Sequence, residues 1–299
     1  MTQLLETPPG ERPEVPGSST SEDPLWSARE LRILAEQAAL RAGSYLRGVF
    51  RGELTVDYKR DLHDLVTEHD RAAEELIVPF LLSHCPQWRI VGEEGGIRGG
   101  ASAVTWYVDP IDGTSNFAQG LAFFCVAIGV EVDGVLAAGV VYDPMAQRMF
   151  SADDAGAYLD GEPLLTPPVQ RAEAATLITG YPTANDLAVD GDAALLDLGG
   201  LICAYSSVRR TGSGALTLAH VAAGWADSAF GSSVSPWDVA GPALILRRAG
   251  GDYRPLWLAG GAAGRPDHLA PGFVATGPGA HYPALDAFAG RIAARRAAG

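Results

Sequence analysis

Apolar side chains recur with a helical period in the first third of the chain. Residues 23–46 form a long amphipathic segment, and Asp23 followed by Pro24 favours a helix start there. Residues 70–83 form a second segment of the same kind, in which Pro79 is expected to introduce a bend. The pattern predicts two helices ahead of the first strand.

Short apolar runs beside glycine follow these helices. The runs "WRIVGEE" (residues 88–94) and "AVTWYVDP" (103–110) are typical of buried strands. The runs "FFCVAIGVEV" (123–132) and "VLAAGVVYD" (135–143) are joined by Asp133-Gly134, a dipeptide that favours a tight hairpin turn. The first half of the chain is therefore expected to contain an antiparallel sheet.

The second half mixes strand-like and helix-like segments. The predicted strands cover residues 175–179, 226–230 and 273–276, and the predicted helices cover 186–198, 213–223, 239–248 and 284–298. A soft break falls at "LLTPPVQ" (164–170). We expect an α/β (α+β) protein with a disordered tail (1–24), an N-terminal α+β half that carries the metal-binding motifs (25–165) and a C-terminal α/β half that completes the site (166–299).

The charge of the chain limits its partners. Its 299 residues carry a formal net charge of −14 and contain no dense run of Lys or Arg, which argues against nucleic acid or an anionic membrane as a partner. The longest apolar run, "LAFFCVAIGV", is about half a bilayer span. Three cysteines cannot all pair, and the N-terminus lacks the pattern of a secretory signal, so a cytoplasmic protein is expected.

Acidic residues stand where predicted strands and one predicted helix meet loops. Glu93 and Glu94 follow "RIVG", Asp109 and Asp112 follow "TWYV", and Asp238 follows Trp237 at a helix start. Acids at the ends of separate strands can converge on one point. Four such carboxylates would carry about −4, which is prohibitive to bury alone but suits two or three divalent cations.

Each of these acids also has a purely structural interpretation. Glu93 and Glu94, between two glycines, could form a solvated turn, and Asp238 could be a helix cap. Asp109 and Asp112 could be turn formers. The string "DPIDGT" makes coincidence less probable, because it adds a glycine and a threonine directly after the second acid.

The string "DPIDGT" (109–114) carries the most specific chemistry. All-oxygen ligands select a hard cation such as Mg²⁺, and Pro110 helps to fix the turn that holds both acids. A helix starting near Thr114 would offer free N–H groups to a phosphate. The covalent route of haloacid dehalogenase phosphatases is excluded at this motif, because Pro110 would occupy the nucleophile position, so the expected nucleophile is water.

In these motifs the chain resembles the inositol monophosphatase family of Mg²⁺-dependent, lithium-sensitive phosphatases. The three signatures are "GEE" (92–94), "DPIDGT" (109–114) and "WDVAG" (237–241), in the family's order. The strings "KRDLHDLVTEHD" (59–70) and "RRTGSGAL" (209–216) are similar to the family's mobile loop and substrate-side segment. The resemblance implies a layered αβαβα sandwich of the inositol monophosphatase and fructose-1,6-bisphosphatase type, a homodimer, and two or three Mg²⁺ per site.

The resemblance also implies roles for individual residues. The metal ligands would be Glu93, Asp109, Asp112, Asp238 and the backbone carbonyl of Ile111. Glu93 and Thr114, with Asp70 behind Thr114, would orient and deprotonate the attacking water. Gly113 and Thr114 would hold the phosphate. Ser213, Gly214, Arg209 and Asp238 would contact the substrate.

The substrate is expected to be a small sugar or polyol phosphate, with inositol 1-phosphate as the first choice. Family members that hydrolyse inositol phosphates generally place a glutamate seven residues before the "WD" aspartate, and this chain has Gly231 there, unless Ser232, Ser233 or Asp227 substitutes. The alternatives are histidinol phosphate, fructose 1,6-bisphosphate or 3′-phosphoadenosine 5′-phosphate. An alternative of another class is a non-catalytic regulatory or binding protein on the same fold.

Overall fold

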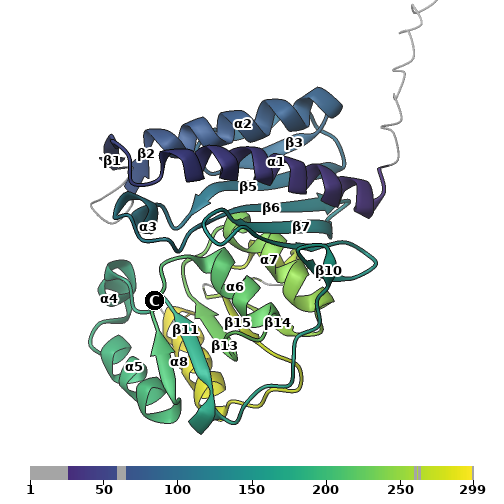
Figure 1. The fold of residues 1–299 in the computed structure, drawn as a ribbon. Coiled ribbons are helices and arrows are strands. Elements are labelled where there is room, and N and C mark those ends of the chain that lie inside the picture. The colour runs from purple at the N-terminus through teal and green to yellow at the C-terminus, as the bar shows by residue number, and fades with distance from the viewer. Residues whose placement is uncertain (1–25, 59–64, 259–260, 262–263, 298–299) are drawn as a thin grey trace, which may run out of the picture.

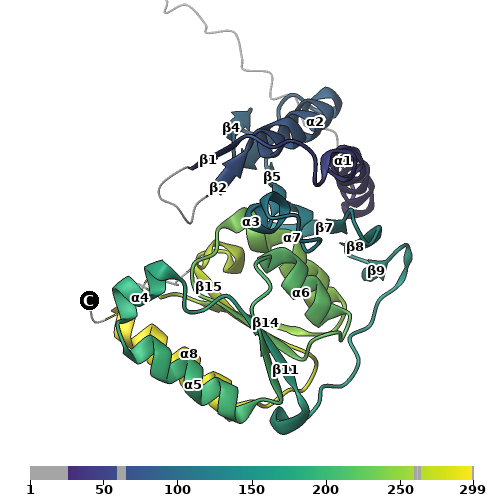
Figure 2. The ribbon, with the colours of Figure 1, turned by 60° about the vertical axis from the view of Figure 1, so that its left-hand side comes forward.

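Two mixed sheets and three layers of helices make up the protein (Figures 1 and 2). The computed structural model describes residues 26–58, 65–258, 261 and 264–297. The expected tail (1–24), the predicted cap Asp23 and residues 59–64 of the loop-like string lie outside the described residues.

The first sheet has eight strands in the order β10-β9-β8-β7-β6-β5-β3-β4. Its strands are β3 (Arg89–Gly92), β4 (Gly96–Gly99), β5 (Val104–Asp112), β6 (Cys125–Val132), β7 (Val135–Asp143), β8 (Arg148–Ala152), β9 (Ala157–Leu159) and β10 (Glu162–Pro163). Neighbours are antiparallel except β3 and β5, which are parallel. Asp133 and Gly134 both have positive φ (51° and 82°), as the predicted hairpin between β6 and β7 requires.

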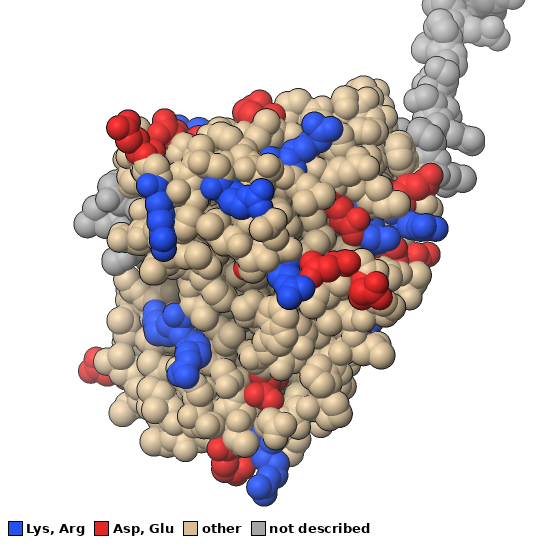
Figure 3. Space-filling model, viewed as in Figure 1, with Lys and Arg blue, Asp and Glu red and all other residues tan. Residues whose placement is uncertain are grey.

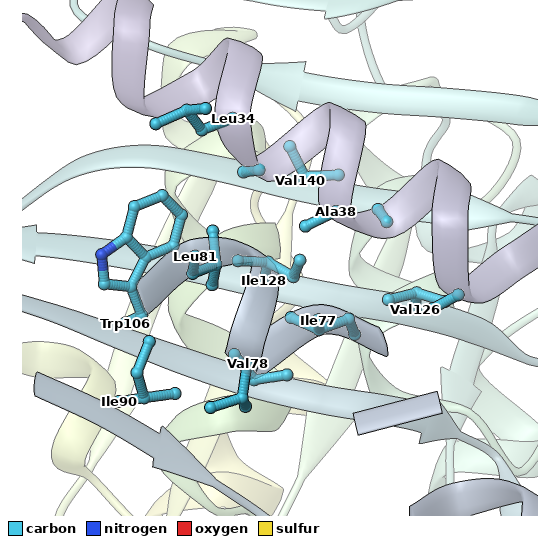
Figure 4. Close-up of a cluster of buried hydrophobic side chains, with 14 of the residues drawn as sticks. Leu34, Ala38, Ile77, Val78, Leu81, Ile90, Trp106, Val126, Ile128 and Val140 are labelled. Atoms are coloured by element: carbon cyan, nitrogen blue, oxygen red, sulfur yellow. The ribbon is translucent and has the colours of Figure 1, made fainter. Parts of the chain in front are cut away.

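Helices α1 (Ala28–Val49) and α2 (Glu68–His84) cover one face of this sheet (Figure 1). Figure 4 shows Leu34 and Ala38 of α1 and Ile77 of α2 packed against Trp106 and Ile128 of the sheet, all within one buried apolar cluster. This contact accounts for the amphipathic pattern of the two helices, because it buries their apolar faces away from water. A short antiparallel pair, β1 (Val56–Tyr58) and β2 (Leu65–Thr67), lies between α1 and α2 in the chain.

The second sheet has five strands in the order β12-β11-β13-β15-β14. Its strands are β11 (Thr176–Thr179), β12 (Ser207–Arg209), β13 (Ser228–Gly231), β14 (Asp252–Leu256) and β15 (Gly272–Thr276). Helices α6 (Gly214–Ala222) and α7 (Pro236–Arg248) lie between the sheets, and α4 (Ala184–Asp190), α5 (Ala193–Ala204) and α8 (Pro283–Ala297) cover the outer face of the second sheet (Figure 2). The expected αβαβα sandwich is confirmed.

Three glycines bring α7 into main-chain contact with the first sheet. A Cβ on Gly241 would lie 2.4 Å from the carbonyl oxygen of Ile128, and one on Gly139 would lie 2.5 Å from the carbonyl oxygen of Gly241. A Cβ on Gly129 would lie 2.5 Å from that of Ala240. The helix therefore sits closer to β6 and β7 than side chains would permit.

Several sequence predictions are corrected at the level of element boundaries. Helix α1 begins at Ala28, because Ser27 and Glu30 form a capping box, so the predicted start at Asp23-Pro24 is wrong. The single helix predicted over 186–198 is two helices, separated where Gly191 adopts φ 61°. The glycine-rich loop after β3 contains the short strand β4, which its composition hid.

The remaining elements are short. A helix of five residues, α3 (Thr114–Ala118), follows β5, and two 3₁₀ turns cover Ala172–Ala174 and Asp267–Leu269. None of the helices in the described part of the chain combines the length and the apolar character that crossing a bilayer requires.

Candidate active site

A β-bulge at the end of β5 turns two aspartates toward the same pocket. Asp109 pairs with Ala127 and Asp112 with Cys125, so β5 has one residue more than β6 over this stretch. In a regular strand, residues three apart point to opposite faces, and the extra residue cancels that alternation. Pro110 fits the irregular position because it has no N–H to donate, and Asp109 Oδ1 accepts the Ile111 N–H at 3.0 Å.

Glu93 reaches the same edge of the sheet because β3 and β5 are parallel. Gly92 pairs with Val108, and the Glu93 N–H donates to the Val108 carbonyl at 3.1 Å. The two strands therefore end side by side. This parallel pair within an otherwise antiparallel sheet is the feature that brings the "GEE" and "DPIDGT" strings together.

Glu74 on α2 holds the turn after Glu93, and sequence reasoning missed it. Its carboxylate is 1% exposed and accepts the Glu94 N–H at 2.9 Å and the Gly95 N–H at 2.7 Å. A Cβ on Gly92 would lie 2.5 Å from Glu74 Oε2, so the glycine makes room for this carboxylate. The available signal was an acid on the otherwise apolar face of α2.

Asp238 enters the pocket from the first turn of α7. Its Oδ2 accepts the Ser235 N–H at 2.8 Å, so the side chain also caps the helix as the structural interpretation expected. Asp238 can cap the helix and line the pocket at the same time, because the glycine contact with β6 and β7 places the start of α7 over the end of β5.

The acids line one pocket of about 340 Å³ between the two sheets. The lining includes Glu93, Asp109, Ile111, Asp112, Gly113, Thr114, Ser213, Gly214 and Asp238 from the motifs, and Ile178, Thr179, Tyr181, Thr183, Thr211, Phe230, Gly231, Ser232, Ser233, Val234 and Phe273 from the second half. Among the described residues, the lining contains no Lys, Arg or His. The pocket is therefore strongly negative.

Mutual repulsion and burial act on these carboxyl groups in the same direction. Burial, together with the charges of Glu93, Asp112 and Asp238, raises the pKa of Asp109 well above its ordinary value. Burial and the neighbouring Asp112 raise the pKa of Asp238 in the same way, against the hydrogen bond from Ser235. The charges of Glu93 and Asp238 both act on Asp109 at close range, and a cation placed among like charges relieves this repulsion.

Asp112 has a second task at the start of α6. Its carboxylate accepts the Gly214 N–H at 3.1 Å, the Ala215 N–H at 2.7 Å and the hydroxyl of Ser213. Burial outweighs these hydrogen bonds and leaves its pKa raised. Asp112 therefore joins the two halves of the protein, and replacing it would disturb the fold as well as the pocket.

Thr114 is held by Asp70 across the start of α2. The Thr114 hydroxyl lies 2.9 Å from Asp70 Oδ1 and 3.0 Å from the Ile111 carbonyl. Asp70 Oδ2 accepts from the backbone N–H and the hydroxyl of Thr67 at 2.7 and 2.6 Å, which makes a capping box for α2. Asp70, which closes the loop-like string and begins the predicted helix 70–83, is thus a fixed residue in the first turn of α2.

Gly113 between Asp112 and Thr114 has a conformation that favours glycine. Its φ is 101°, and a Cβ there would lie 3.1 Å from the Phe123 carbonyl oxygen and 3.2 Å from that of Gly212. The chain can therefore pass closely beneath the pocket and start α3 at Thr114.

The residues proposed for substrate contact are divided by the structure. Ser213 and Gly214 line the pocket, but both also donate to Asp112. Arg209 is exposed and does not line the pocket; one of its N–H groups donates to the Val208 carbonyl. Much of the remaining lining comes from β11, β13 and β15. The apolar residues of these strands gave no sign of a site in the sequence.

The pocket residues fit a magnesium-type cation by their chemistry. The donors are carboxylate and carbonyl oxygens, they are buried, and no cationic side chain of the described lining compensates them. No three of the described His, Cys, Asp and Glu side chains already stand in the geometry of a finished ligand set. Binding would thus require the carboxylates to rearrange.

The sandwich and its acidic pocket define the class, a layered α/β phosphatase. Residues 27–288 match the model of the inositol monophosphatase family, and the chain belongs to that family. Members of the family generally depend on Mg²⁺ and act on small phosphate esters.

Relatives in the family carry two kinds of name. The chain is 33% identical over 253 residues to the inositol-1-monophosphatase of Synechocystis sp., covering 81% of this chain and 88% of the relative. It is 36% identical over 220 residues to the Nus factor SuhB of Vibrio cholerae, covering 73% and 82%. Among solved structures, SuhB of Bartonella henselae matches with a TM-score of 0.76 at 29% identity, covering 88% of this chain and 98% of that one.

Proposed function

We propose that the protein is a Mg²⁺-dependent phosphomonoesterase that hydrolyses a small alcohol phosphate by attack of water. The observation that carries the proposal is the convergence of Glu93, Asp109, Asp112 and Asp238 on one pocket without a cationic side chain in its described lining. Such a cluster is costly in the empty protein and is compensated by divalent cations.

Named residues would hold the cations and the water. Glu93, Asp109, Asp112, Asp238 and the Ile111 carbonyl would bind two or three Mg²⁺, which supply Lewis acidity and a more acidic water. Thr114 would orient that water through its hydroxyl, and Asp70 fixes this hydroxyl from behind.

The phosphate would lie between the cations and the loop at Gly113. Gly113 allows the main chain to approach the anion, and the N–H groups of Gly113 and Thr114 would donate to phosphate oxygens. Tight positioning of phosphate against water is the main requirement of this chemistry.

The pocket favours a monophosphate over the bisphosphate alternatives. A second phosphate would need basic partners, and the described lining has none; Arg209 lies outside it. Inositol 1-phosphate is the first substrate to test, because relatives are named for it.

Figure 3 shows acidic and basic side chains dispersed over one face of the molecule without a large basic patch.

Phosphate release tests the proposal directly. The full chain is assayed with inositol 1-phosphate and 4-nitrophenyl phosphate, with Mg²⁺ and with EDTA in its place. Release that requires Mg²⁺ and is lost in Asp109→Asn, while the exposed Asp154→Asn behaves like wild type, supports the function. No release from any ester with Mg²⁺ present would refute it.

The second candidate is a non-catalytic regulatory role on the same fold. Its support is the name Nus factor, which several relatives carry. The phosphate-release assay separates the two candidates. A purely regulatory protein releases no phosphate from any ester, and Asp109→Asn leaves its regulatory role unaffected.

We also propose a cytoplasmic homodimer. Leu195, Leu196 and Ile202 expose 55, 79 and 56% of their surfaces on α5, which supports a partner surface. Cys85, Cys125 and Cys203 are all free thiols, as in a reducing compartment. Light scattering of the purified chain tests the dimer, and a monomeric mass at assay concentration would contradict it.

A further inference from the structure

The lining of the pocket includes an aromatic ring where β13 pairs with β15. Gly231 of β13 and Phe273 of β15 are direct partners across an antiparallel pair. A Cβ on Gly231 would lie 2.5 Å from Cε1 of the Phe273 ring. The ring therefore fills the space that any side chain at position 231 would need.

The Phe273 ring is fixed in this place. The residue is 2% exposed and packs within the apolar cluster between the sheets, next to Ala229 and Ala275. Ile178 and Val234 line the pocket beside it. The Phe230 ring belongs to the cluster on the other face of the sheet, where it packs on Tyr181 and Phe288. Ile178, Val234 and Phe273 thus form the apolar part of the lining that would face the alcohol of an ester.

Three of the hydroxyl groups that line the pocket direct their protons away from it. Tyr181 Oη donates to Asp190 at 2.9 Å, Thr183 Oγ1 donates to Asp186 at 2.8 Å, and Ser232 Oγ donates to Asp186 at 2.9 Å. The two acids belong to α4, behind the pocket. These hydroxyls therefore offer a ligand neutral oxygen atoms at most, which are weaker acceptors than a carboxylate.

Asp227 does not supply the missing carboxylate either. It does not line the pocket, and it accepts the Gln170 N–H at 3.0 Å and the Thr176 N–H at 2.8 Å. A substrate hydroxyl pressed against the Phe273 side would lose its water without gaining a charged partner, which disfavours a hydroxyl-rich alcohol.

We infer that Phe273, with Gly231 beneath it, makes the enzyme selective for phosphate monoesters whose alcohol presents an apolar ring or chain, over cyclitol phosphates. The inference rests on the proposed phosphatase function and narrows its substrate class. Apolar carbon of the alcohol contacts Ile178, Phe273 and Val234, and the phosphate stays at Gly113 and Thr114.

Cyclohexyl phosphate and myo-inositol 1-phosphate provide a matched test. They carry the same six-membered ring and differ in the ring hydroxyls. The hydroxyls make inositol the better leaving group, so a preference for cyclohexyl phosphate must come from the pocket. With Mg²⁺ and the full chain, we expect kcat/KM for cyclohexyl phosphate to exceed that for inositol 1-phosphate by about tenfold or more, the size of discrimination that apolar pockets achieve.

The outcomes separate the inference from the function on which it depends. Mg²⁺-dependent release with a ratio below about tenfold, or with inositol preferred, overturns the selectivity and leaves the phosphatase standing. No release from either ester, and none from 4-nitrophenyl phosphate, overturns the phosphatase and the selectivity with it.

A substitution in the wall adds a second measurement. Val234→Thr adds a hydroxyl of nearly equal volume to the pocket, and we expect it to shift the preference toward inositol 1-phosphate by about three- to tenfold. Val189→Thr, at a residue 65% exposed on α4 and outside the pocket, is the matched control and should not shift it. An equal shift in both variants would contradict the role of the wall.

Discussion

The hydroxyl of Thr114 lies 2.9 Å from Asp70 Oδ1, which joins the first turn of α3 to the first turn of α2. Asp70 is 1% exposed, and its second oxygen is engaged by Thr67. The threonine hydroxyl is therefore held in one orientation at the edge of the acidic pocket. Its proposed role in orienting the water can be tested apart from the metal ligands.

Thr114→Ala should lower kcat by about 10²- to 10⁴-fold, the usual contribution of a group that positions or accepts a proton. Thr114→Ser keeps the hydroxyl and should retain most of the activity. Phosphate release under saturating Mg²⁺ is the measurement, and circular dichroism checks the fold. If the alanine variant matched the serine variant, the hydroxyl would have no role in turnover.

Asp109→Asn should stabilise the protein in the absence of metal and remove its response to metal. The substitution deletes one charge from a crowded, buried cluster, while the amide oxygen can still accept the Ile111 N–H. Thermal unfolding of the wild type should shift upward with added Mg²⁺, because only the folded state binds it. The variant should begin higher in EDTA and should shift little. A full Mg²⁺ shift in the variant would exclude Asp109 as a ligand.

Arg296 on α8 neutralises the acids behind the pocket. Its Nη2 lies 2.6 Å from both Asp186 and Asp190, and Nη1 donates to the Ser232 carbonyl at 3.1 Å. Arg296→Met leaves Asp186 buried without a counter-charge and Asp190 with Arg295 alone, 3.4 Å away, and it should lower the free energy of unfolding by about 3 kcal/mol.

The control for this variant is Arg254→Met, which removes an exposed ion pair with Asp286. Such pairs contribute about 0 to 1 kcal/mol, so denaturant unfolding should barely change. Equal losses in the two variants would show that the buried network behind the pocket has no special weight.

His220 gives the stability a pH dependence that can be isolated. The ring packs against Phe123, Phe150 and Trp225, and burial lowers its pKa to about 4. An unfolded histidine titrates near 6.5, so between these values the unfolded chain binds more protons and stability falls as the pH falls.

His220→Leu should remove up to about 1.4 kcal/mol per pH unit of this slope between pH 6.5 and 4, measured by urea unfolding. The exposed His281→Leu is the control and should keep the wild-type slope. Parallel stability curves for wild type and His220→Leu would contradict the buried, neutral ring.

The order of elements could be predicted because their signals are local. The period of α1 and α2, the Asp133-Gly134 turn and the apolar runs of β5, β6 and β7 depend on neighbouring residues alone. The boundaries that failed depend on competing local choices. Ser27 and Glu30 form the capping box of the described helix, and Gly191 ended a helix that composition would have continued.

The acidic half of the site was visible in the sequence, and the other half was not. Glu93, Asp109, Asp112 and Asp238 stand in short, unusual strings, and the pocket contains all of them. Phe273 looks like an ordinary core residue, because only the pairing of β13 with β15 places it beside Gly231 in the pocket lining. Glu74 and Arg296 act through contacts distant in sequence. The only local sign of Glu74 was an acid on the buried face of α2, and no local pattern marks Arg296.

The glycine contact between α7 and the first sheet limits which parts of the pocket can tolerate substitutions. Because backbone meets backbone at Gly129, Gly139 and Gly241, even one methyl group there would lift the helix and withdraw Asp238 from its fellow acids. The alcohol-facing wall depends on side-chain packing instead, so it can change where fitted residues such as Gly231 and Phe273 change together. Descendants of this chain could acquire new esters by altering that wall while inheriting the reaction centre intact.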